Sequence, residues 1–208
     1  MASLTRVAQA AWLGSKYALD RPDAEFAVET LQAGGLVVYP TDTLYGLGAD
    51  ASNPGAVERA VSAKARPEAQ GISVAVSGLS QIEAWARVGG AARNFIASNL
   101  PGPYTVILAP SGSAPPHLVS ALGIAFRIPR HPIAALLTRL FGPITATSAN
   151  RHGGAAPVDV ATARAQLGDA VALYLDAGPC ELGEPSSVVD FTGDRPKVLR
   201  QGGVAPKG

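Results

Sequence analysis

The sequence predicts an α/β (or α+β) domain in which helices flank a twisted, mixed sheet. Apolar stretches of strand length alternate with amphipathic stretches of helix length along most of the 208 residues, which is typical of helices packed on a sheet. Several of the last predicted strands follow one another without a helix between them, which favours antiparallel as well as parallel pairing. The 23 glycines and 17 prolines indicate many tight turns, so we expect loops to build the functional site.

In the first half of the chain, residues 24–33 are predicted to form a helix because apolar residues share one face and a glycine pair follows. Residues 36–39 are predicted to form a buried strand that leads into a polar, hydroxyl-rich loop at 40–43. Asn53 is expected to cap the next helix, with Pro54 in its first turn. The other elements expected here are that helix, to about residue 64, a strand at 72–76, and helices at 79–87 and 91–99.

The second half continues the alternation and ends in three strands. We expect strands at 104–109, 124–128, 144–147, 171–175, 187–191 and 198–200, and helices at 133–140 and 160–167, the latter capped by Asp159. No linker-like segment divides the chain. We therefore expect one domain over residues 1–208, with its core at about 24–203 and a loose tail at 202–208.

Composition and charge exclude several classes of protein. With 47% hydrophobic and 16% charged residues, the chain is too apolar for a disordered tail, yet no apolar run reaches the roughly 18 residues of a membrane span. Residues 1–16 lack the pattern of a secretory signal, and the single cysteine, Cys180, cannot form an internal disulfide. A net charge of +1 argues against a dedicated nucleic-acid binder. We expect a soluble cytoplasmic protein without membrane association.

The common cofactor and metal fingerprints fit poorly. Residues 46–51 match the letters of a dinucleotide-binding turn, but they lie several residues beyond the strand instead of directly after it. The chain has no phosphate-loop motif and no serine-hydrolase elbow, and His117, His131 and His152 are not at metal-ligand spacing. We therefore predict no metal site built by the protein itself.

Two groups of polar residues at the ends of predicted elements remain as candidates for a functional site. Lys64 and Arg66 stand at the end of a predicted helix, where they could either complement the helix dipole or bind an anion. Ser148 and Asn150 belong to a turn after an apolar strand, and hydroxyl, amide and backbone N–H groups occur both in anion sites and in ordinary loops. Taken alone, these residues leave both interpretations open.

Seven short motifs stand in order along the chain. They are PTDTLYGLG at 40–48, KARP at 64–67, PGPYT at 101–105, RIP at 127–129, SAN at 148–150, SSVVD at 186–190 and VLRQG at 198–202. Together they resemble the YrdC-like family of threonylcarbamoyl-AMP synthases, in its short single-domain form, over about residues 24–203. So many ordered motifs are a specific match, and the resemblance implies a twisted mixed sheet with a large, concave, basic cleft.

The resemblance also implies roles for individual residues. Arg127 is the implied partner of the threonine carboxylate, and Arg66 could form a planar fork to phosphate oxygens that a lysine cannot form. The other residues implied for threonine are Thr41, Tyr45, Ser73, Thr105, Ser186 and the backbone near Ala146. The residues implied for ATP are Lys64, Arg66, Leu122, Ser148, Asn150 and Arg200, and Lys64, Arg66, Ser148 and Asn150 are also the implied catalytic residues.

The implied reaction is that of a nucleotidyltransferase. The threonine amine captures CO2 from bicarbonate, and the carbamate attacks the α-phosphate of ATP, so that pyrophosphate leaves and threonylcarbamoyl-AMP remains. Such displacements depend mainly on alignment and on charge neutralisation, and Mg2+ is expected to arrive with ATP. The expected partners are L-threonine, bicarbonate, ATP and the complex that transfers the threonylcarbamoyl group to tRNA.

The chain departs from the family pattern at two places. Residues 68–70 are Glu-Ala-Gln where the family usually has Pro-Leu, and residues 186–187 are Ser-Ser where it usually has Ser-Thr. Two rival interpretations stay open. One is a paralogue with the same fold and another nucleotide-dependent reaction, because a fold does not fix a function. The other is a non-catalytic module that binds tRNA or double-stranded RNA through backbone charge.

Overall fold

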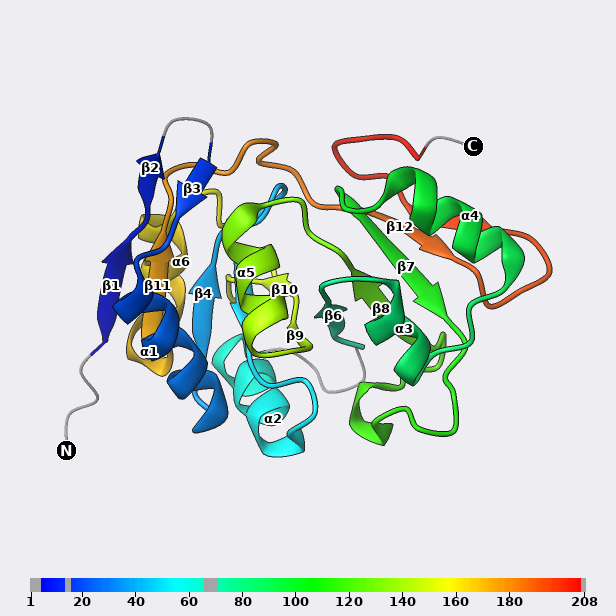
Figure 1. The fold of residues 1–208 in the computed structure, drawn as a ribbon, viewed down its shortest axis with the longest axis horizontal. Coiled ribbons are helices and arrows are strands. Elements are labelled where there is room, and N and C mark those ends of the chain that lie inside the picture. The colour runs from blue at the N-terminus through cyan, green and yellow to red at the C-terminus, as the bar shows by residue number, and fades with distance from the viewer. Residues whose placement is uncertain (1–4, 14–15, 66–70, 207–208) are drawn as a thin grey trace.

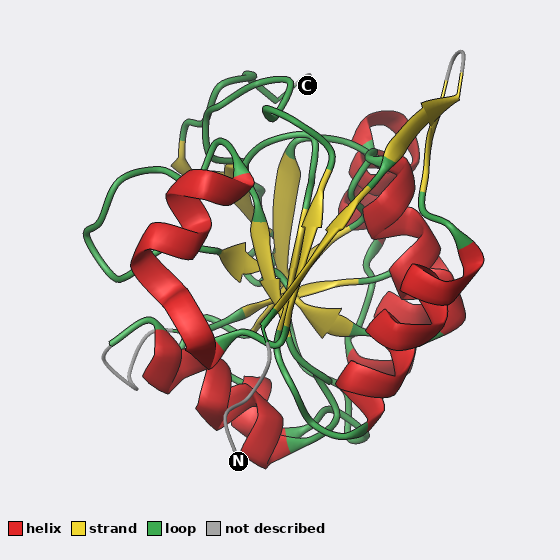
Figure 2. Ribbon diagram, turned by 90° about the vertical axis from the view of Figure 1, so that its left-hand side faces the viewer, coloured by secondary structure: helices red, strands yellow, loops and turns green. Residues whose placement is uncertain are grey.

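The computed structural model describes residues 5–13, 16–65 and 71–206 of the chain. Within these ranges the fold consists of two mixed sheets, a two-stranded hairpin and six α-helices (Figure 1). The helices are α1 (Arg21–Gln32), α2 (Pro54–Ala63), α3 (Leu79–Trp85), α4 (Gly90–Asn99), α5 (Pro132–Leu140) and α6 (Val160–Leu167). The hairpin is formed by β2 (Ala11–Leu13) and β3 (Lys16–Ala18). Figure 2 shows the strands between two groups of helices.

The first sheet has five strands, in the order β1-β11-β4-β5-β10. They are β1 (Arg6–Gln9), β11 (Leu173–Asp176), β4 (Val37–Tyr39), β5 (Gly46–Gly48) and β10 (Thr147–Ser148). Strands β1, β11 and β4 pair in parallel, whereas β5 is antiparallel to both of its neighbours. The strand β4 turns back through a six-residue loop into β5, and this loop reaches the site described below.

The second sheet has six strands, in the order β13-β12-β7-β8-β6-β9. They are β13 (Lys197–Arg200), β12 (Ser187–Asp190), β7 (Tyr104–Leu108), β8 (Ile124–Arg127), β6 (Ser73–Ala75) and β9 (Ile144–Thr145). Two of the five pairings, β12 with β7 and β8 with β6, are parallel, and the other three are antiparallel. The mixed sheets and flanking helices confirm the predicted fold class.

The two sheets meet at Ala146. The stretch 144–147, predicted as one strand, is divided, because β9 pairs in the second sheet and β10 in the first. Ala146 lies between them and donates its backbone N–H to the carbonyl oxygen of Ser73 at 2.7 Å. This change of sheet brings the ends of strands from both sheets to one place, and the candidate site is built there.

Each face of the first sheet covers its own apolar core. Val37 and Tyr39 of β4 pack in the core under α1 and α5, whereas Val38 between them packs in the core shared with the second sheet. This alternation follows from the period of two of a strand. The helix starts predicted from their capping residues are confirmed, because Asn53 accepts from the Ala56 N–H at 3.2 Å and Asp159 from the Thr162 N–H at 2.7 Å.

Apart from the divided stretch 144–147, the expected helices and strands are all present, with ends shifted by a few residues. The structure adds the N-terminal strands β1 to β3 and the strand β5, which the sequence pattern does not predict. Strand β5 escapes prediction because glycine has a low strand propensity. Its glycines are needed for packing, since a Cβ atom at Gly46 would lie 2.8 Å from the Tyr39 ring.

The expectation of a loose tail is wrong for residues 202–205. The Ser187 hydroxyl accepts from the Gly202 N–H at 2.9 Å and donates to the Val204 carbonyl oxygen at 2.6 Å. The Tyr104 hydroxyl donates to the Ala205 carbonyl oxygen at 3.1 Å. These hydrogen bonds fix the segment against β7 and β12, whereas residues 207–208 lie outside the described ranges.

None of the helices in the described ranges is both long and apolar enough to cross a membrane.

Substituting alanine at Gly202 tests the close packing of this segment. A Cβ atom there would lie 2.1 Å from the Pro185 carbonyl oxygen and 2.5 Å from the Ser187 nitrogen. Because rigid backbone would have to move, we expect Gly202→Ala to lower the free energy of unfolding by about 1–3 kcal/mol, measured by urea denaturation. Gly193→Ala is the control, because nothing lies within 4 Å of a Cβ atom at Gly193. Equal stability of the two variants would contradict the packing argument.

Candidate functional site

A cavity of about 170 Å³ lies where strand ends of the two sheets meet. Its walls come from the β4–β5 loop, from β6, β7 and β8, from the crossing at Ala146, and from the residues before β12 and at the end of β13. The residues that line it are Thr41, Thr43, Leu44, Tyr45, Gly46, Ser73, Thr105, Arg127, Ala146, Thr147, Ser148, Pro185, Ser186 and Arg200. All seven residues predicted for threonine, together with Ser148 and Arg200, are among them.

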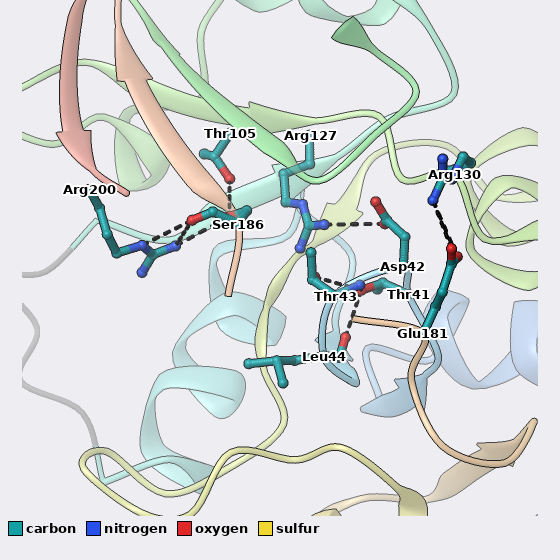
Figure 3. A network of polar contacts seen from close by, with 10 residues as sticks. All are labelled: Thr41, Asp42, Thr43, Leu44, Thr105, Arg127, Arg130, Glu181, Ser186 and Arg200. Atoms are coloured by element: carbon teal, nitrogen blue, oxygen red, sulfur yellow. Dashed lines mark hydrogen bonds and ion pairs between the residues drawn. The ribbon is translucent and has the colours of Figure 1, made fainter. Parts of the chain in front are cut away.

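The β4–β5 loop is held in a compact turn by its own hydroxyls. The Thr41 hydroxyl donates to the Leu44 carbonyl oxygen at 2.7 Å and accepts from the Thr43 N–H at 3.1 Å. The two threonine hydroxyls are also 2.9 Å apart (Figure 3). Because these bonds close the turn locally, the loop presents a fixed set of polar groups to the cavity.

A second polar group lies on the opposite wall. The hydroxyls of Thr105 and Ser186 are 2.8 Å apart. Arg200 donates to the Ser186 carbonyl oxygen from Nε at 3.0 Å and from Nη2 at 2.8 Å, and to the Ser186 hydroxyl at 3.2 Å (Figure 3). Burial lowers the pKa of Arg200, and the positive charge of Arg127 lowers it further. Two guanidinium groups therefore line the same small cavity.

Arg127 lies at the end of β8 and is paired with Asp42 of the β4–β5 loop. Its Nη2 atom is 3.3 Å from the Asp42 Oδ1 atom, and the two side chains are only 8% and 1% exposed. Among the described residues, Asp42 pairs with Arg127 alone and the hydrogen bonds of Arg200 are to Ser186, so two guanidinium groups share one nearby carboxylate. The arrangement favours a small anionic ligand, such as a molecule with a carboxylate, over a cation.

Three of the expected phosphate residues, Lys64, Ser148 and Asn150, lie together at the edge of the cavity. Lys64, at the end of α2, is 3% exposed, and its ammonium donates to the carbonyl oxygens of Ser148 and Asn150 and, at 3.3 Å, to Asn150 Oδ1. The Ser148 hydroxyl donates to the same Oδ1 atom at 2.6 Å. Lys64 therefore shapes the 148–150 turn, and of these three residues only Ser148 lines the cavity.

Three further predicted residues, Arg66, Leu122 and Tyr45, lie in different environments or outside the described ranges. Arg66 lies outside the described residues. Leu122 is 51% exposed in the turn between Ser120 and Gly123 and does not line the cavity. The Tyr45 hydroxyl donates to the Gly178 carbonyl oxygen at 2.7 Å and accepts from the Ala177 N–H at 3.0 Å, and burial raises its pKa well above the ordinary value. Its hydroxyl therefore fixes a crossing segment of backbone.

Several residues in and around the cavity have no role predicted from the sequence. They are Thr43, Leu44, Gly46, Thr147 and Pro185, which line it, and Asp42, which pairs with Arg127 behind its wall. A signal for Asp42 existed, because a buried arginine requires a carboxylate or several acceptors and Asp42 is the acidic residue of the PTDT motif.

Comparison with known proteins identifies relatives over most of the chain. The sequence model of the Sua5/YciO/YrdC domain, described as "Telomere recombination", matches residues 29–202. A Mycobacterium tuberculosis protein named "Putative threonylcarbamoyl-AMP synthase" is 43% identical over 181 residues, which is 86% of this chain and 83% of that protein. The Bacillus subtilis protein named "Threonylcarbamoyl-AMP synthase" is 34% identical over 189 residues, covering 88% of this chain and 54% of its own length.

Solved structures share the fold. The structure of P. abyssi Sua5 complexed with L-threonine aligns with a TM-score of 0.88 and 30% identity over 95% of this chain. This chain spans 58% of the length of that protein. The structure of E. coli YciO aligns with a TM-score of 0.80 and 27% identity over 96% of both chains. The match over 29–202 and these relatives confirm the resemblance found in the motifs, and the chain belongs to the Sua5/YciO/YrdC family.

Proposed function

We propose that this chain is a threonylcarbamoyl-AMP synthase, which forms threonylcarbamoyl-AMP and pyrophosphate from L-threonine, bicarbonate and ATP. The observation that carries the proposal is the small cavity lined by Arg127, Arg200 and several hydroxyls. The names of the relatives from M. tuberculosis and B. subtilis support it. The L-threonine in the P. abyssi Sua5 structure supports the choice of substrate.

The cavity offers partners for the carboxylate, the hydroxyl and the methyl group of threonine. Arg127 is the guanidinium for the carboxylate, as expected from the sequence. The paired hydroxyls of Thr105 and Ser186 can exchange hydrogen bonds with the threonine hydroxyl, because either of them can act as the donor. Ala146 and Leu44 supply apolar surface for the methyl group. A site built to hydrogen-bond a hydroxyl discriminates strongly against amino acids that lack one.

ATP is proposed to bind beside the cavity, along the 148–150 turn. Ser148 belongs both to this turn and to the cavity wall, so a phosphate held there would lie next to the threonine amine. Lys64 fixes the turn, and Arg66, Leu122 and Arg200 complete the proposed nucleotide contacts. Magnesium is proposed to enter bound to the phosphates of ATP, since it usually keeps phosphate and water ligands.

The proposed reaction requires alignment more than acid or base catalysis. The threonine nitrogen bonds to CO2 derived from bicarbonate and loses a proton, which yields a carbamate. A carbamate oxygen then attacks the α-phosphorus of ATP, the bond to the bridging oxygen breaks, and pyrophosphate leaves. Nearby cations and backbone N–H groups stabilise the charge that develops at phosphorus. Burial raises the pKa of the Cys180 thiol to about 12, so we assign it no part in this chemistry.

The product is proposed to pass to a tRNA-modifying transferase complex in the cytoplasm.

The paralogue interpretation keeps some support, since E. coli YciO matches this chain over 96% of both lengths and its name states no reaction. The interpretation as an RNA-binding module has a distinct property, because binding to a phosphate backbone weakens steeply as salt rises. Turnover that depends on threonine would not follow that salt dependence.

The first test is pyrophosphate release by the full chain with ATP, Mg2+ and bicarbonate. We expect release to require L-threonine and to fall by about 100-fold or more with L-valine, which has the same shape but lacks the hydroxyl. Folded protein that releases pyrophosphate equally with and without threonine, or not at all, would contradict the proposal and favour the paralogue or the RNA-binding module.

The second test concerns Lys64. Lys64→Met keeps most of the side-chain length but removes the ammonium that joins Ser148 and Asn150. Because buried charge-assisted bonds contribute about 1.5–3 kcal/mol each, we expect the KM for ATP to rise by about 10-fold or more. The control is Lys197→Met, on the exposed strand β13, with an unchanged KM. An unchanged KM for ATP in Lys64→Met would show that the turn does not help to bind ATP.

A further inference from the structure

The ion pair between Asp42 and Arg127 is incomplete. A guanidinium has a lateral edge, formed by Nε and Nη2, that can hold both oxygens of one carboxylate. Here Nη2 donates to Asp42 Oδ1 at 3.3 Å, a long distance for such a bond. The other nitrogen of this edge, Arg127 Nε, and the other carboxylate oxygen, Asp42 Oδ2, are both buried. Neither atom has a hydrogen-bond partner among the described residues. Half of a two-bond arrangement is therefore formed.

Leaving these atoms unpaired is costly, because a buried polar atom without a partner costs about 1–3 kcal/mol. Asp42 cannot easily swing away to find another partner. Its backbone lies between Thr41 and Thr43, whose hydroxyls close the turn. Its carbonyl oxygen also accepts from the Leu182 N–H at 3.3 Å. The backbone that carries this carboxylate is thus held in place, so a rotation of the Arg127 guanidinium toward it is the movement that would complete the second bond.

We propose that Asp42 is a positioning residue for the amino-acid substrate, which completes the two-bond contact with the lateral edge of Arg127 when the substrate binds. The adjacent, terminal edge of the guanidinium, formed by Nη1 and the second N–H of Nη2, then points into the cavity in one orientation and receives the substrate carboxylate. Asp42 does not line the cavity, so it acts through Arg127 and not on the substrate itself. This inference rests on the proposed function, because it takes threonine as the ligand.

If Asp42 acted only through its charge, removing that charge would strengthen the binding of the substrate carboxylate. Asp42 is an anion close to Arg127, so its removal alone would leave more net positive charge and strengthen the attraction for a carboxylate. If Asp42 instead orients Arg127, removing its carboxylate should weaken catalysis, because a guanidinium that is not held in one orientation binds the substrate in several poses. Reactions that depend on alignment lose about 100-fold in rate for a displacement of about 1 Å.

The test compares Asp42→Asn with a matched variant of a neighbouring ion pair. Asparagine keeps the shape of Asp42, but its amide NH2 would face the Nε–H donor and cannot complete the second bond. We expect kcat/KM for L-threonine in pyrophosphate release to fall by about 10- to 100-fold, with the KM for ATP within about 3-fold. Asp42→Glu, which keeps the carboxylate, should retain more activity than Asp42→Asn.

Glu181→Gln is the matched control. Glu181 pairs with Arg130 at 3.2 Å, three residues beyond Arg127, but both side chains are more than half exposed (Figure 3). Exposed pairs contribute little, so kcat/KM for threonine should be unchanged. An Asp42→Asn enzyme with wild-type or higher kcat/KM for threonine would overturn the inference. Absence of threonine-dependent turnover in the wild-type enzyme would instead overturn the proposed function.

A measurement on the wild-type protein avoids any effect of the substitution on folding. The Nε–H signal of Arg127 can be followed by NMR and assigned by its loss in Arg127→Lys. We expect saturating L-threonine to slow the exchange of this proton with water and to shift its signal, because the proton acquires an acceptor. Threonine that binds and leaves both the exchange rate and the shift unchanged would contradict the proposed two-bond contact.

Discussion

The buried guanidinium of Arg127 is the constraint around which the site is organised. A buried charge is tolerated only when it is paired, and here the partner comes from the other sheet, since Arg127 ends β8 and Asp42 follows β4. Pairing the two requires the sheets to meet at this point, which the division of residues 144–147 into β9 and β10 permits. Replacing a buried ion pair by apolar residues is often neutral or stabilising. Stability is thus a weak reason for the pair, and a function in binding is a better one.

The other polar side chains of the cavity are held by hydrogen bonds to nearby residues. These bonds leave further donor and acceptor groups facing the cavity. The hydroxyls of Thr41 and Thr43 close their own turn, and Arg200 is held by Ser186. The backbone around Ser186 is fixed in turn by the segment at Gly202, which packs too closely for any side chain. A rigid, preformed site of this kind reduces the entropy that a small ligand must lose.

Much of the fold could be predicted from the sequence, because helix caps and apolar periodicity are local signals. Asn53 and Asp159 cap helices where expected, and the strand ends that carry Thr41, Arg127 and Ser186 are close to their predicted places. The parts that escaped depend on contacts distant in sequence. Strand β1 exists because it pairs with β11, more than 160 residues away, and β5 consists of glycine and leucine that only the packing against Tyr39 explains.

The candidate site was reached mainly through motifs and not through periodicity. The residues expected to bind threonine share one cavity, but spacing alone could not show that Tyr45 directs its hydroxyl to the backbone at 177–178. Spacing also could not show that the Lys64 ammonium donates its hydrogen bonds to the 148–150 turn. Both sets of hydrogen bonds depend on how segments distant in sequence cross. The role proposed for Asp42 rests on the unpaired atoms of its buried pair with Arg127, which no sequence pattern can show.

Arg127 is proposed to receive a carboxylate in the cavity between the two sheets. The most direct measurement is a crystal structure of the chain with L-threonine and a non-hydrolysable ATP analogue. We expect the threonine carboxylate to lie within about 3 Å of the Arg127 Nη atoms, with the threonine amine facing the α-phosphate and the analogue lying along the 148–150 turn. Threonine bound elsewhere, or in the cavity with its carboxylate turned away from Arg127, would contradict this proposal.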